Sequence, residues 1–125
     1  MRPEAAGAPR AWPEELRLRD GGAILTVSFD NGERYDLPAE YLRVESPSAE
    51  VKGHGPGQEV TVPGKRNVRV TKIEPVGNYA VRLIFSDDHS TGLYAWDYLA
   101  KLGREQDRLW AAYLEQLDAQ GLSRV

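Results

Sequence analysis

Apolar and polar residues alternate in the first third of the chain, and the pattern predicts a unit of antiparallel strands. Leu16 and Leu18 alternate with arginines, and a β-rich run over 23–29 is followed at once by Asn31-Gly32. Asn-Gly between two such runs predicts a hairpin with a type I′ turn, because both central residues of that turn need a positive φ. The return strand is expected over 33–37.

The pattern then becomes irregular. Pro38 fits the first position of a short helical turn through Arg43, because its missing N–H costs nothing there. The stretch 45–67 is rich in proline and glycine. Long loops inside a compact domain are usually functional or disordered, so we expect a mobile excursion, with a short extended piece over 59–62.

A second β unit follows the irregular stretch. It begins over 68–73 and turns at 76–78 into a strand over 79–85, in which Val81, Leu83 and Phe85 share one face. The polar run 86–90 ends that strand, since aspartate and serine side chains hydrogen-bond their own backbone in turns.

Two helices are predicted at the C-terminal end. One starts at Tyr94 and ends at Gly103, read as a left-handed cap. The second covers 105–120, is capped by Gly121, and carries an apolar stripe: Leu109, Trp110, Tyr113, Leu114 and Leu117. Such a stripe is typical of core or interface, and an exposed Trp–Tyr face would be the alternative, a docking site for a partner.

Together these elements predict a fold of the α+β class. We expect a single small domain over 12–103, with antiparallel β-hairpin units forming a sheet that two C-terminal helices cover on one face. A disordered leader is expected over 1–11, where no periodicity is seen, and an amphipathic helix over 104–125.

Composition limits the classes of function that this protein can have. A hydrophobic content of 41% and a charged content of 28% are ordinary for a soluble globular protein. The net charge of −3 argues against nucleic acid as the partner. Without cysteines, disulfides, thiolate catalysis and cysteine zinc sites are excluded. No apolar run approaches the roughly 20 residues of a membrane span, so we expect no membrane partner and a cytoplasmic protein.

The candidate chemistry centres on two histidines. His89 follows Asp87 and Asp88, so a metal-binding or acid–base role is one interpretation. The other is that the carboxylates satisfy turn amides while His89 packs under the following helix. His54 lies between glycines and is expected to be solvated, because a flexible loop holds a ligand poorly.

Other motifs have ordinary explanations. A basic stretch is predicted to lie at a solvated strand edge and not to form an anion site; its residues are Lys65, Arg66, Arg69 and Lys72. The serines have no Gly-x-Ser-x-Gly elbow around them, and the glycine-rich run 53–57 lacks the Gly-Lys-Ser/Thr ending of a phosphate loop. We therefore expect no enzymatic activity.

One segment carries a family resemblance. The pattern Ser-Asp-x-His-x-x-Gly-x-Tyr-x-Trp over 86–96, the run 24–38, and Tyr41-Leu42-Arg43 ahead of Ser46-Pro47-Ser48 resemble the gamma-butyrobetaine hydroxylase-like N-terminal domain family. The resemblance covers about 12–103. It is to the stand-alone bacterial type that lacks zinc cysteines, a domain of unknown function.

The resemblance implies a metal site that this chain has altered. In the family's best-understood setting the domain precedes an Fe(II)-dependent oxygenase domain and holds zinc by Cys-x-Cys-x-x-Cys and one later histidine. Laid onto this chain, those positions are Ser46, Ser48, Val51 and His89. Hydroxyls are poor zinc ligands and valine is none, so the zinc site is not expected to form. The chain has no room for the oxygenase domain, whose activity is not carried over.

We therefore predict a non-catalytic accessory module that acts through a protein partner, with no cofactor, as a monomer or weak homodimer. Other relatives are appended to ATPases of iron–sulfur cluster delivery, which implies a metalloprotein or an iron–sulfur factor as partner. The predicted surface is the edge with the flexible loop; its residues are His89, Tyr94, Trp96, Asp87 and Asp88. The alternative is weak iron or zinc binding by His89 with Asp87 or Asp88.

Overall fold

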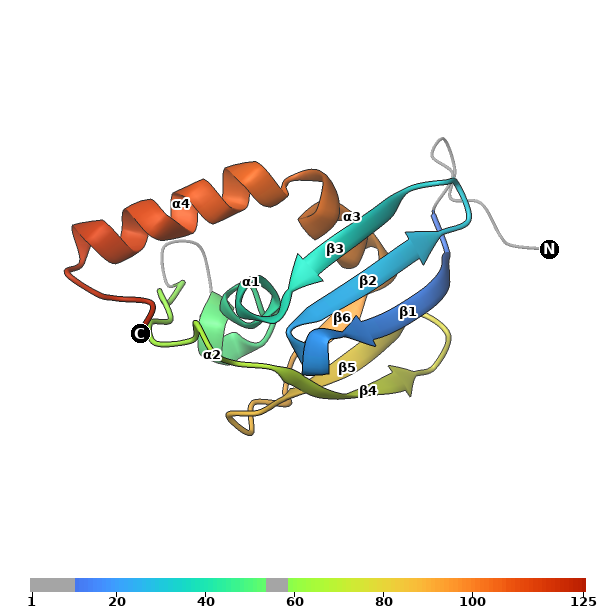
Figure 1. Ribbon diagram of the computed structural model, residues 1–125, viewed down its shortest axis with the longest axis horizontal. Helices are drawn as coiled ribbons and strands as arrows, with labels where there is room; N and C mark the ends of the chain where they lie inside the picture. The colour runs from blue at the N-terminus through green and yellow to red at the C-terminus, as the bar shows by residue number, and fades with distance from the viewer. Residues whose placement is uncertain (1–10, 54–58) are drawn as a thin grey trace.

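The strands form two separate antiparallel sheets. The computed structural model describes residues 11–53 and 59–125. The first sheet has the order β1-β2-β3 and the second β4-β5-β6, each with three strands (Figure 1). Among the described residues no ladder pairs a strand of one sheet with a strand of the other, so the two hairpin units, expected to share one sheet, form two. The strands are β1 (Pro13–Arg19), β2 (Ile24–Phe29), β3 (Arg34–Pro38), β4 (Val70–Val76), β5 (Ala80–Phe85) and β6 (Leu93–Ala95).

Helices occupy the connections and the C-terminal end. A 3₁₀ turn, η1 (Asp20–Gly22), joins β1 to β2. The helices are α1 (Ala39–Val44), α2 (Ala49–Lys52), α3 (Trp96–Arg104) and α4 (Gln106–Ala119). The α+β class, the antiparallel hairpin units, the short helix after the first unit and the two C-terminal helices are confirmed.

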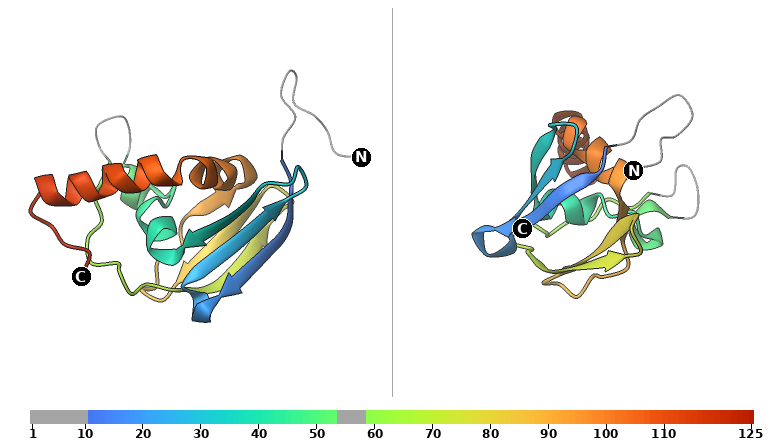
Figure 2. Two further views of the ribbon diagram at one scale, coloured as in Figure 1. Left: turned by 45° about the horizontal axis from the view of Figure 1, so that its top comes forward. Right: turned by 90° about the vertical axis from the view of Figure 1, so that its right-hand side faces the viewer.

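Both sheets contribute to one core. In each strand every second side chain points inward, because successive side chains point to opposite faces of the sheet. In Figure 2 the sheets form two layers, and α1 and α3 pack beside them. The largest fully buried side chains are Tyr41, Tyr94, Phe85, Leu25, Leu37, Leu42, Leu83, Leu99, Leu102, Val27, Val70 and Val81.

The two layers meet at a corner where backbone touches backbone. Gly22, with φ of 93°, lies against β4 so closely that a Cβ there would be 2.2 Å from the carbonyl oxygen of Val70. Arg69 fixes the same corner from the other side, because its Nη1 donates to the Asp20 carbonyl oxygen at 2.7 Å. Only glycine allows this approach, so position 22 helps to set how the sheets join.

The first hairpin has a different turn from the one predicted. Gly32 has a φ of 91°, but Asn31 does not have a positive φ. The Gly32 N–H donates to the Phe29 carbonyl, and the Phe29 N–H donates to the Glu33 carbonyl. This is a type I turn followed by a left-handed glycine, which gives a three-residue loop in place of the expected two-residue type I′ turn.

The helix predicted from Tyr94 begins later and ends differently. Tyr94 belongs to β6, where it pairs with Val81, and α3 starts at Trp96. Gly103 lies inside α3 rather than capping it. A Cβ at Gly103 would be 2.3 Å from Cγ of Tyr35, so this glycine allows the helix to pack closely on the Tyr35 ring.

The irregular stretch contains a helix that the sequence did not suggest. Helix α2 follows Ser48, and no strand forms over 59–62. That segment still has fixed partners: the Val60 N–H donates to the Val51 carbonyl at 2.7 Å, and the Tyr113 hydroxyl donates to the Val62 carbonyl at 2.6 Å. The remainder of the predicted excursion, 54–58, lies outside the described residues, as does the predicted leader except for Ala11.

The apolar stripe of α4 faces inward. Tyr113 and Leu117 are buried against Val44, and the Trp110 ring packs on Tyr41 with centroids 6.3 Å apart. The core interpretation of this stripe is therefore confirmed for these residues, whereas Leu114 is 40% exposed. Gly121 has a φ of 66°, and the Leu122 N–H donates to the Leu117 carbonyl, so the predicted glycine cap is also confirmed.

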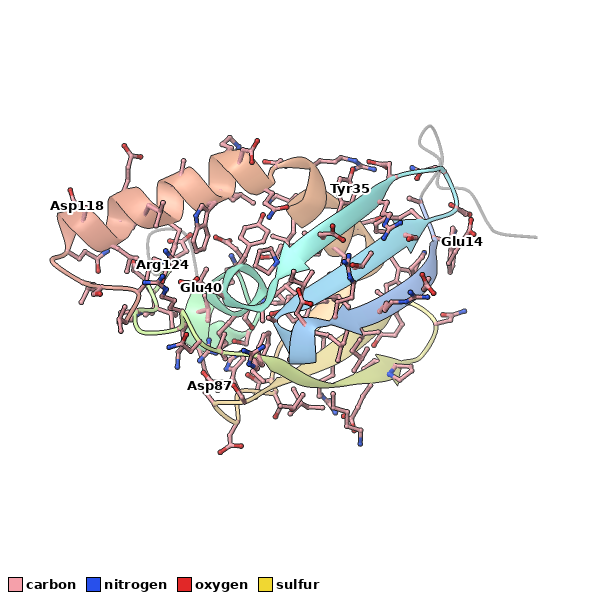
Figure 3. The ribbon with its side chains drawn as sticks, viewed as in Figure 1. Glu14, Tyr35, Glu40, Asp87, Asp118 and Arg124 are labelled. Carbon is pink, nitrogen blue, oxygen red and sulfur yellow. The ribbon has the colours of Figure 1, made fainter. Side chains whose placement is uncertain are left out.

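The C-terminal tail ties α4 to the rest of the fold. Arg124 forms a bidentate ion pair with Glu40, at 2.8 and 2.7 Å, and its guanidinium lies 5.3 Å from the Trp110 ring centroid (Figure 3). The Arg66 N–H also donates to the Arg124 carbonyl at 2.9 Å. Because Glu40 is only 6% exposed, this pair gains more than a solvated surface pair would.

Candidate functional site

The turn after β5 directs His89 into the protein. The Asp87 Oδ1 atom accepts from the His89 N–H at 3.2 Å, and Asp88 adopts a φ of 69°. The Phe85 N–H donates to the His89 carbonyl at 3.0 Å and closes the loop. Aspartate commonly stabilises turns in this way, as the sequence predicted. The His89 side chain is left only 2% exposed.

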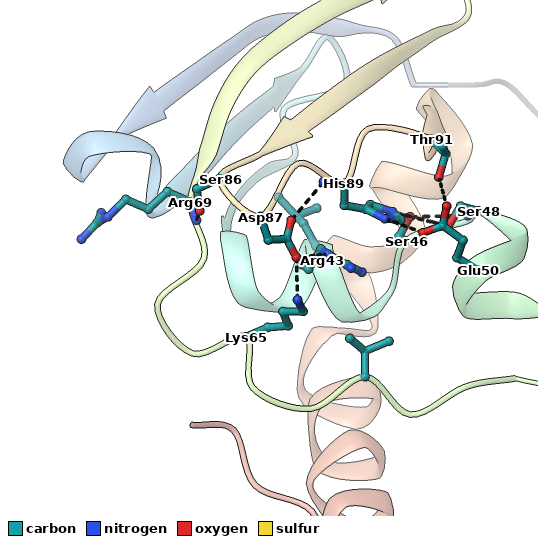
Figure 4. A network of polar contacts seen from close by, with 12 residues as sticks. Arg43, Ser46, Ser48, Glu50, Lys65, Arg69, Ser86, Asp87, His89 and Thr91 are labelled. Atoms are coloured by element: carbon teal, nitrogen blue, oxygen red, sulfur yellow. Dashed lines mark hydrogen bonds and ion pairs between the residues drawn. The ribbon is translucent and has the colours of Figure 1, made fainter.

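Asp87 has its own partners and does not reach the His89 ring. Its Oδ2 lies 2.8 Å from Nε of Arg43 and 2.7 Å from Nζ of Lys65 (Figure 4). Burial alone would raise the pKa of Asp87, but the hydrogen bonds from Lys65 and Arg43 outweigh it and lower the pKa to about 2. Lys65, predicted to be a solvated edge residue, is therefore part of an ion-pair network.

The His89 ring joins two buried serines to a glutamate. Its Nε2 lies 2.9 Å from Oγ of Ser46 and 3.4 Å from Oγ of Ser48, and its Nδ1 lies 3.2 Å from Oε2 of Glu50. Burial lowers the pKa of His89, the Arg43 charge lowers it further, and Glu50 opposes both. The neutral ring that results donates from Nδ1 to Glu50 and accepts at Nε2 from the Ser46 hydroxyl. We refer to Ser46, Ser48, Glu50 and His89 as the histidine cluster.

The histidine cluster has the order of groups found in serine hydrolases, but it is sealed. Ser46 is 0% exposed. Gly92 lies against it so closely that a Cβ would be 2.4 Å from the Ser46 Oγ. A nucleophile must reach its substrate, so a serine enclosed in this way cannot attack one. The geometry orients an imidazole and satisfies buried hydroxyls, and it supports no catalytic step.

Sequence reasoning missed the role of Glu50. No nucleophile elbow surrounds the serines, and Glu50 lies 39 residues from His89 in a stretch that the sequence predicts to be a loop. The one signal was spacing: Ser46, Ser48 and Glu50 occupy alternate positions. Alternation in a proline-rich stretch is too weak a pattern to predict a buried cluster.

The donor groups at the four positions that the resemblance assigns to zinc do not fit a metal ion. The structure does bring Ser46, Ser48 and His89 together. Val51 lies on α2, and its side chain is buried. One imidazole, two hydroxyls and an aliphatic side chain cannot form a zinc or iron site. Within 11–53 and 59–125, no group of three or more His, Cys, Asp or Glu residues is arranged to hold a metal.

The geometry gives no support to the alternative metal site, in which His89 would act with Asp87 or Asp88. The carboxylate beside the His89 ring belongs to Glu50, whereas Asp87 is paired with Arg43 and Lys65. Asp88 is exposed on the turn. His54, the other histidine, lies outside the described residues.

The predicted binding surface separates into interior and exterior residues. Tyr94 is 0% exposed, and its hydroxyl donates to the Leu42 carbonyl at 2.6 Å. His89 is also internal. The expectation that these two residues form a surface is therefore wrong, because both side chains belong to the packed interior. Trp96 is half-buried, and its Nε1 donates to the Asn78 carbonyl at 2.8 Å.

Trp96 has two aromatic neighbours that the sequence did not connect with it. With Trp12 and Tyr79 it lines a pocket of about 180 Å³, completed by Ala11, Ala95 and Asp97. Tyr79 is 57% exposed, and its carbonyl accepts from the Trp96 N–H. Trp12 is held by Asp30, whose carboxylate accepts a hydrogen bond from the Trp12 backbone N–H at 3.1 Å. We call Trp12, Tyr79 and Trp96 the aromatic corner.

A larger cavity of about 540 Å³ lies between α4 and the segment after residue 58. Its wall includes Val51, Val60 and Tyr113. Two charged residues at its edge neutralise each other, since Nζ of Lys52 lies 3.3 Å from Oε1 of Glu45.

Comparison with known proteins identifies the family. Residues 16–100 match the family model described as gamma-butyrobetaine hydroxylase-like, N-terminal. No curated protein matches the chain. Two solved structures, each described as an NMR solution structure of a protein, share 46% sequence identity with this chain at a TM-score of 0.80. One alignment covers 92% of this chain and the other covers 99%. Each alignment covers 90% of the solved chain.

A crystal structure is also similar. It is a protein of unknown function from Acidithiobacillus ferrooxidans, assigned to the DUF971 family, with 38% identity and a TM-score of 0.60 over 73% of this chain and 91% of that one. No helix in the described part of this chain is long and apolar enough to cross a membrane. The family model spans more than half of the sequence, and the chain therefore belongs to the gamma-butyrobetaine hydroxylase-like N-terminal family.

Proposed function

We propose that this protein is a non-catalytic binding module that acts through a protein partner, and that the aromatic corner is the contact. The observation that supports this is the gathering of three large aromatic side chains from separate segments around one surface pocket. The histidine cluster resembles catalytic machinery, but its Ser46 hydroxyl is closed to substrate.

Aromatic residues of this kind suit recognition. Tryptophan and tyrosine offer a large apolar area with few rotatable bonds, and they are enriched among the residues that dominate binding energy at interfaces. Tyr79 leaves 57% of its surface in water. A partner that covers the Tyr79 ring would remove its apolar surface from water, which gains free energy that folding alone does not provide.

The corner is also rigid enough to select a partner. Trp12 exchanges hydrogen bonds with Asp30, since the Asp30 N–H donates to the Trp12 carbonyl at 2.8 Å. Trp96 is fixed to the turn between β4 and β5 through the Asn78 and Tyr79 carbonyls. Pre-organised side chains lose less conformational entropy on binding.

The test is a quantitative affinity capture with the full chain as bait. The family resemblance makes a metalloprotein or an iron–sulfur factor the first class of partner to examine. Wild type is compared with Tyr79→Ala and with Leu114→Ala, a control on α4 where the side chain is 40% exposed. We expect one partner to be retained by wild type and Leu114→Ala and lost by Tyr79→Ala. Equal recovery with Tyr79→Ala would overturn the assignment of the contact.

A further inference from the structure

We infer that Glu40 and Trp110 form an arginine-binding site, which the chain's own Arg124 fills and which an arginine in a peptide segment of a partner protein can take over. Glu40 belongs to α1 and Trp110 to α4, so the site joins two helices (Figure 3). No residue of the aromatic corner lines it. The inference therefore goes beyond the proposed contact and does not depend on it.

The carboxylate of Glu40 is the anchor of the site. It is 6% exposed, and Arg124 binds both of its oxygens, with Nε 2.8 Å from Oε2 and Nη2 2.7 Å from Oε1. A carboxylate withdrawn from water is unfavourable unless a cation pairs with it. A guanidinium matches two carboxylate oxygens with two parallel N–H donors. If Arg124 left, Glu40 would therefore favour another guanidinium.

The Trp110 ring supplies the other half of the site. The Arg124 guanidinium lies 5.3 Å from the ring centroid, within the range of a cation–π contact. The ring is held in place by Tyr41 and Tyr113, whose centroids lie 6.3 and 5.2 Å away. A fixed ring and a carboxylate that share one side chain favour arginine over lysine, because the planar guanidinium stacks on aromatic faces.

The site is open to solvent beside its present occupant. The Arg124 side chain is 37% exposed. A hollow of about 260 Å³ adjoins it, and its lining residues are Pro38, Glu40, Tyr41, Gln106, Trp110 and Arg124. Helix α4 ends before the tail, and the Leu122 N–H closes its last turn on the Leu117 carbonyl. Arg124 can therefore leave by a movement of the residues after Leu122, with α4 intact.

Backbone contacts around Arg124 indicate the kind of occupant. The Gly64 N–H donates to the Ser123 carbonyl, and the Arg66 N–H donates to the Arg124 carbonyl, each at 2.9 Å. In peptide recognition, main-chain bonds of this kind supply affinity, while side-chain pockets supply specificity. The occupant is therefore a peptide segment that lies along 64–66 and places an arginine on Glu40 and Trp110.

The tail sets a threshold for any competing segment. A short flexible tether holds its group at an effective concentration of about 1 mM or more. A partner must exceed that value or add contacts outside the site. Arg124 would therefore exclude weak basic ligands and yield only to a segment that binds more of the surface.

The experiment uses NMR on the full chain labelled with ¹⁵N and carrying Arg124→Ala, which empties the side-chain site. The probe is ethylguanidinium, and ethylurea is the matched control with nearly the same shape and no charge. Arg124→Gln is a second host, because its amide can still donate to Glu40 if the alanine variant does not fold. The three tryptophans give three indole signals, and those of Trp12 and Trp96 are internal controls.

We expect ethylguanidinium to shift the Trp110 indole signal saturably and to leave Trp12 and Trp96 unchanged. Ethylurea should bind about 10-fold more weakly, and so should ethylguanidinium to wild type, where Arg124 competes. Adding Glu40→Gln to Arg124→Ala should remove the preference for the cation. The peptide acetyl-Leu-Ser-Arg-Val should also shift the Gly64 and Arg66 backbone N–H signals, whereas its citrulline analogue should not.

Three results would overturn the inference. Equal affinity for ethylguanidinium and ethylurea, or no saturable shift at Trp110 in either host, would show that no arginine site exists apart from the tail. Binding of ethylguanidinium without any peptide effect at Gly64 and Arg66 would overturn the peptide segment as occupant. None of these results involves Tyr79, so failure here is distinguishable from failure of the proposed function.

Discussion

The histidine cluster and the aromatic corner make opposite use of residues that usually carry function. The cluster assembles an imidazole, two hydroxyls and a carboxylate, and folding encloses the ring and the hydroxyls until Ser46 and His89 have almost no contact with water. The corner assembles three aromatic side chains of the kind that usually enter a core, and leaves Tyr79 largely exposed.

The difference shows that burial, more than residue type, decides what each group can do. A buried hydrogen-bonded network contributes to stability because breaking one member leaves the others unsatisfied. An exposed aromatic ring contributes little to folding and is available for binding. The cluster should therefore respond to substitution with changes in stability, and the corner with changes in binding.

The largest effect is expected at His89. Replacing it with alanine removes a buried ring and leaves the Ser46 hydroxyl without its acceptor, so the free energy of unfolding should fall by about 3 kcal/mol. Urea unfolding followed by circular dichroism measures this, with Leu114→Ala as a surface control. A loss below about 1 kcal/mol, within the range of ordinary surface changes, would show that the cluster does not support the fold.

The next effect concerns Asp87 and depends on pH. Its pKa is about 2 in the folded protein, below the ordinary 3.8. A carboxyl whose pKa is depressed by folding stabilises above its ordinary pKa, and this contribution is lost as the pH falls from about 4 toward 2. Asp87→Asn should lower the free energy of unfolding by about 2 kcal/mol at pH 7 and flatten the slope between pH 4 and 2. An unchanged slope in urea titrations across this range would contradict the assignment.

A smaller effect is expected at Glu50, which belongs to the cluster but has a side chain 64% exposed. Glu50→Gln should change the free energy of unfolding by only about 0.5 kcal/mol, because solvent screens the pair. It should also lower the pKa of His89 further, since Glu50 raises it more than the other nearby carboxylate, Asp87, does. NMR titration of the His89 ring measures the shift, and a rise in the pKa would contradict the geometry.

The same titration should connect His89 with stability. Because burial holds the pKa of His89 below its ordinary value in the folded state, the unfolded chain takes up the proton first. The contribution of His89 to stability is therefore complete above its ordinary pKa and declines as the pH falls toward the folded pKa. In His89→Gln this decline should be absent.

At the aromatic corner, Tyr79→Ala should leave the free energy of unfolding within about 0.5 kcal/mol of wild type, as for most exposed positions. The ring contacts Gly77, where a Cβ would be 2.9 Å from Cε1 of Tyr79, but most of it faces solvent. Thermal unfolding of both proteins measures the difference. A loss above about 1.5 kcal/mol would show that Tyr79 supports the fold and would remove the contrast between the two regions.

No effect is expected from metal. Addition of Zn²⁺, or of Fe²⁺ without oxygen, should leave the His89 ring signals unchanged, because the cluster offers one imidazole and two hydroxyls as donors. A saturable shift centred on His89 would show that a metal site forms with other ligands. This titration separates a structural cluster from a metal centre.

The sequence by itself determined several of the local elements. Alternation at Val81, Leu83 and Phe85 predicted a strand with one buried face, and the stripe on α4 predicted which side of that helix packs. Gly121 predicted the end of the helix, because glycine readily adopts the positive φ that lets the following N–H groups bond to the last carbonyls of the helix. These features depend on neighbours a few residues away, and periodicity reports them directly.

Only the tertiary structure decided which distant residues meet. Glu50 and His89 are 39 residues apart, and the aromatic corner joins three segments that no local pattern connects. The first turn also has a different type from the one predicted. Helix α3 starts later than predicted, because the strand pairing of Tyr94 outweighed its position on a helical face. Long-range packing sets burial, and burial separates a sealed polar cluster from an open aromatic pocket, so local patterns in the sequence could locate neither of them.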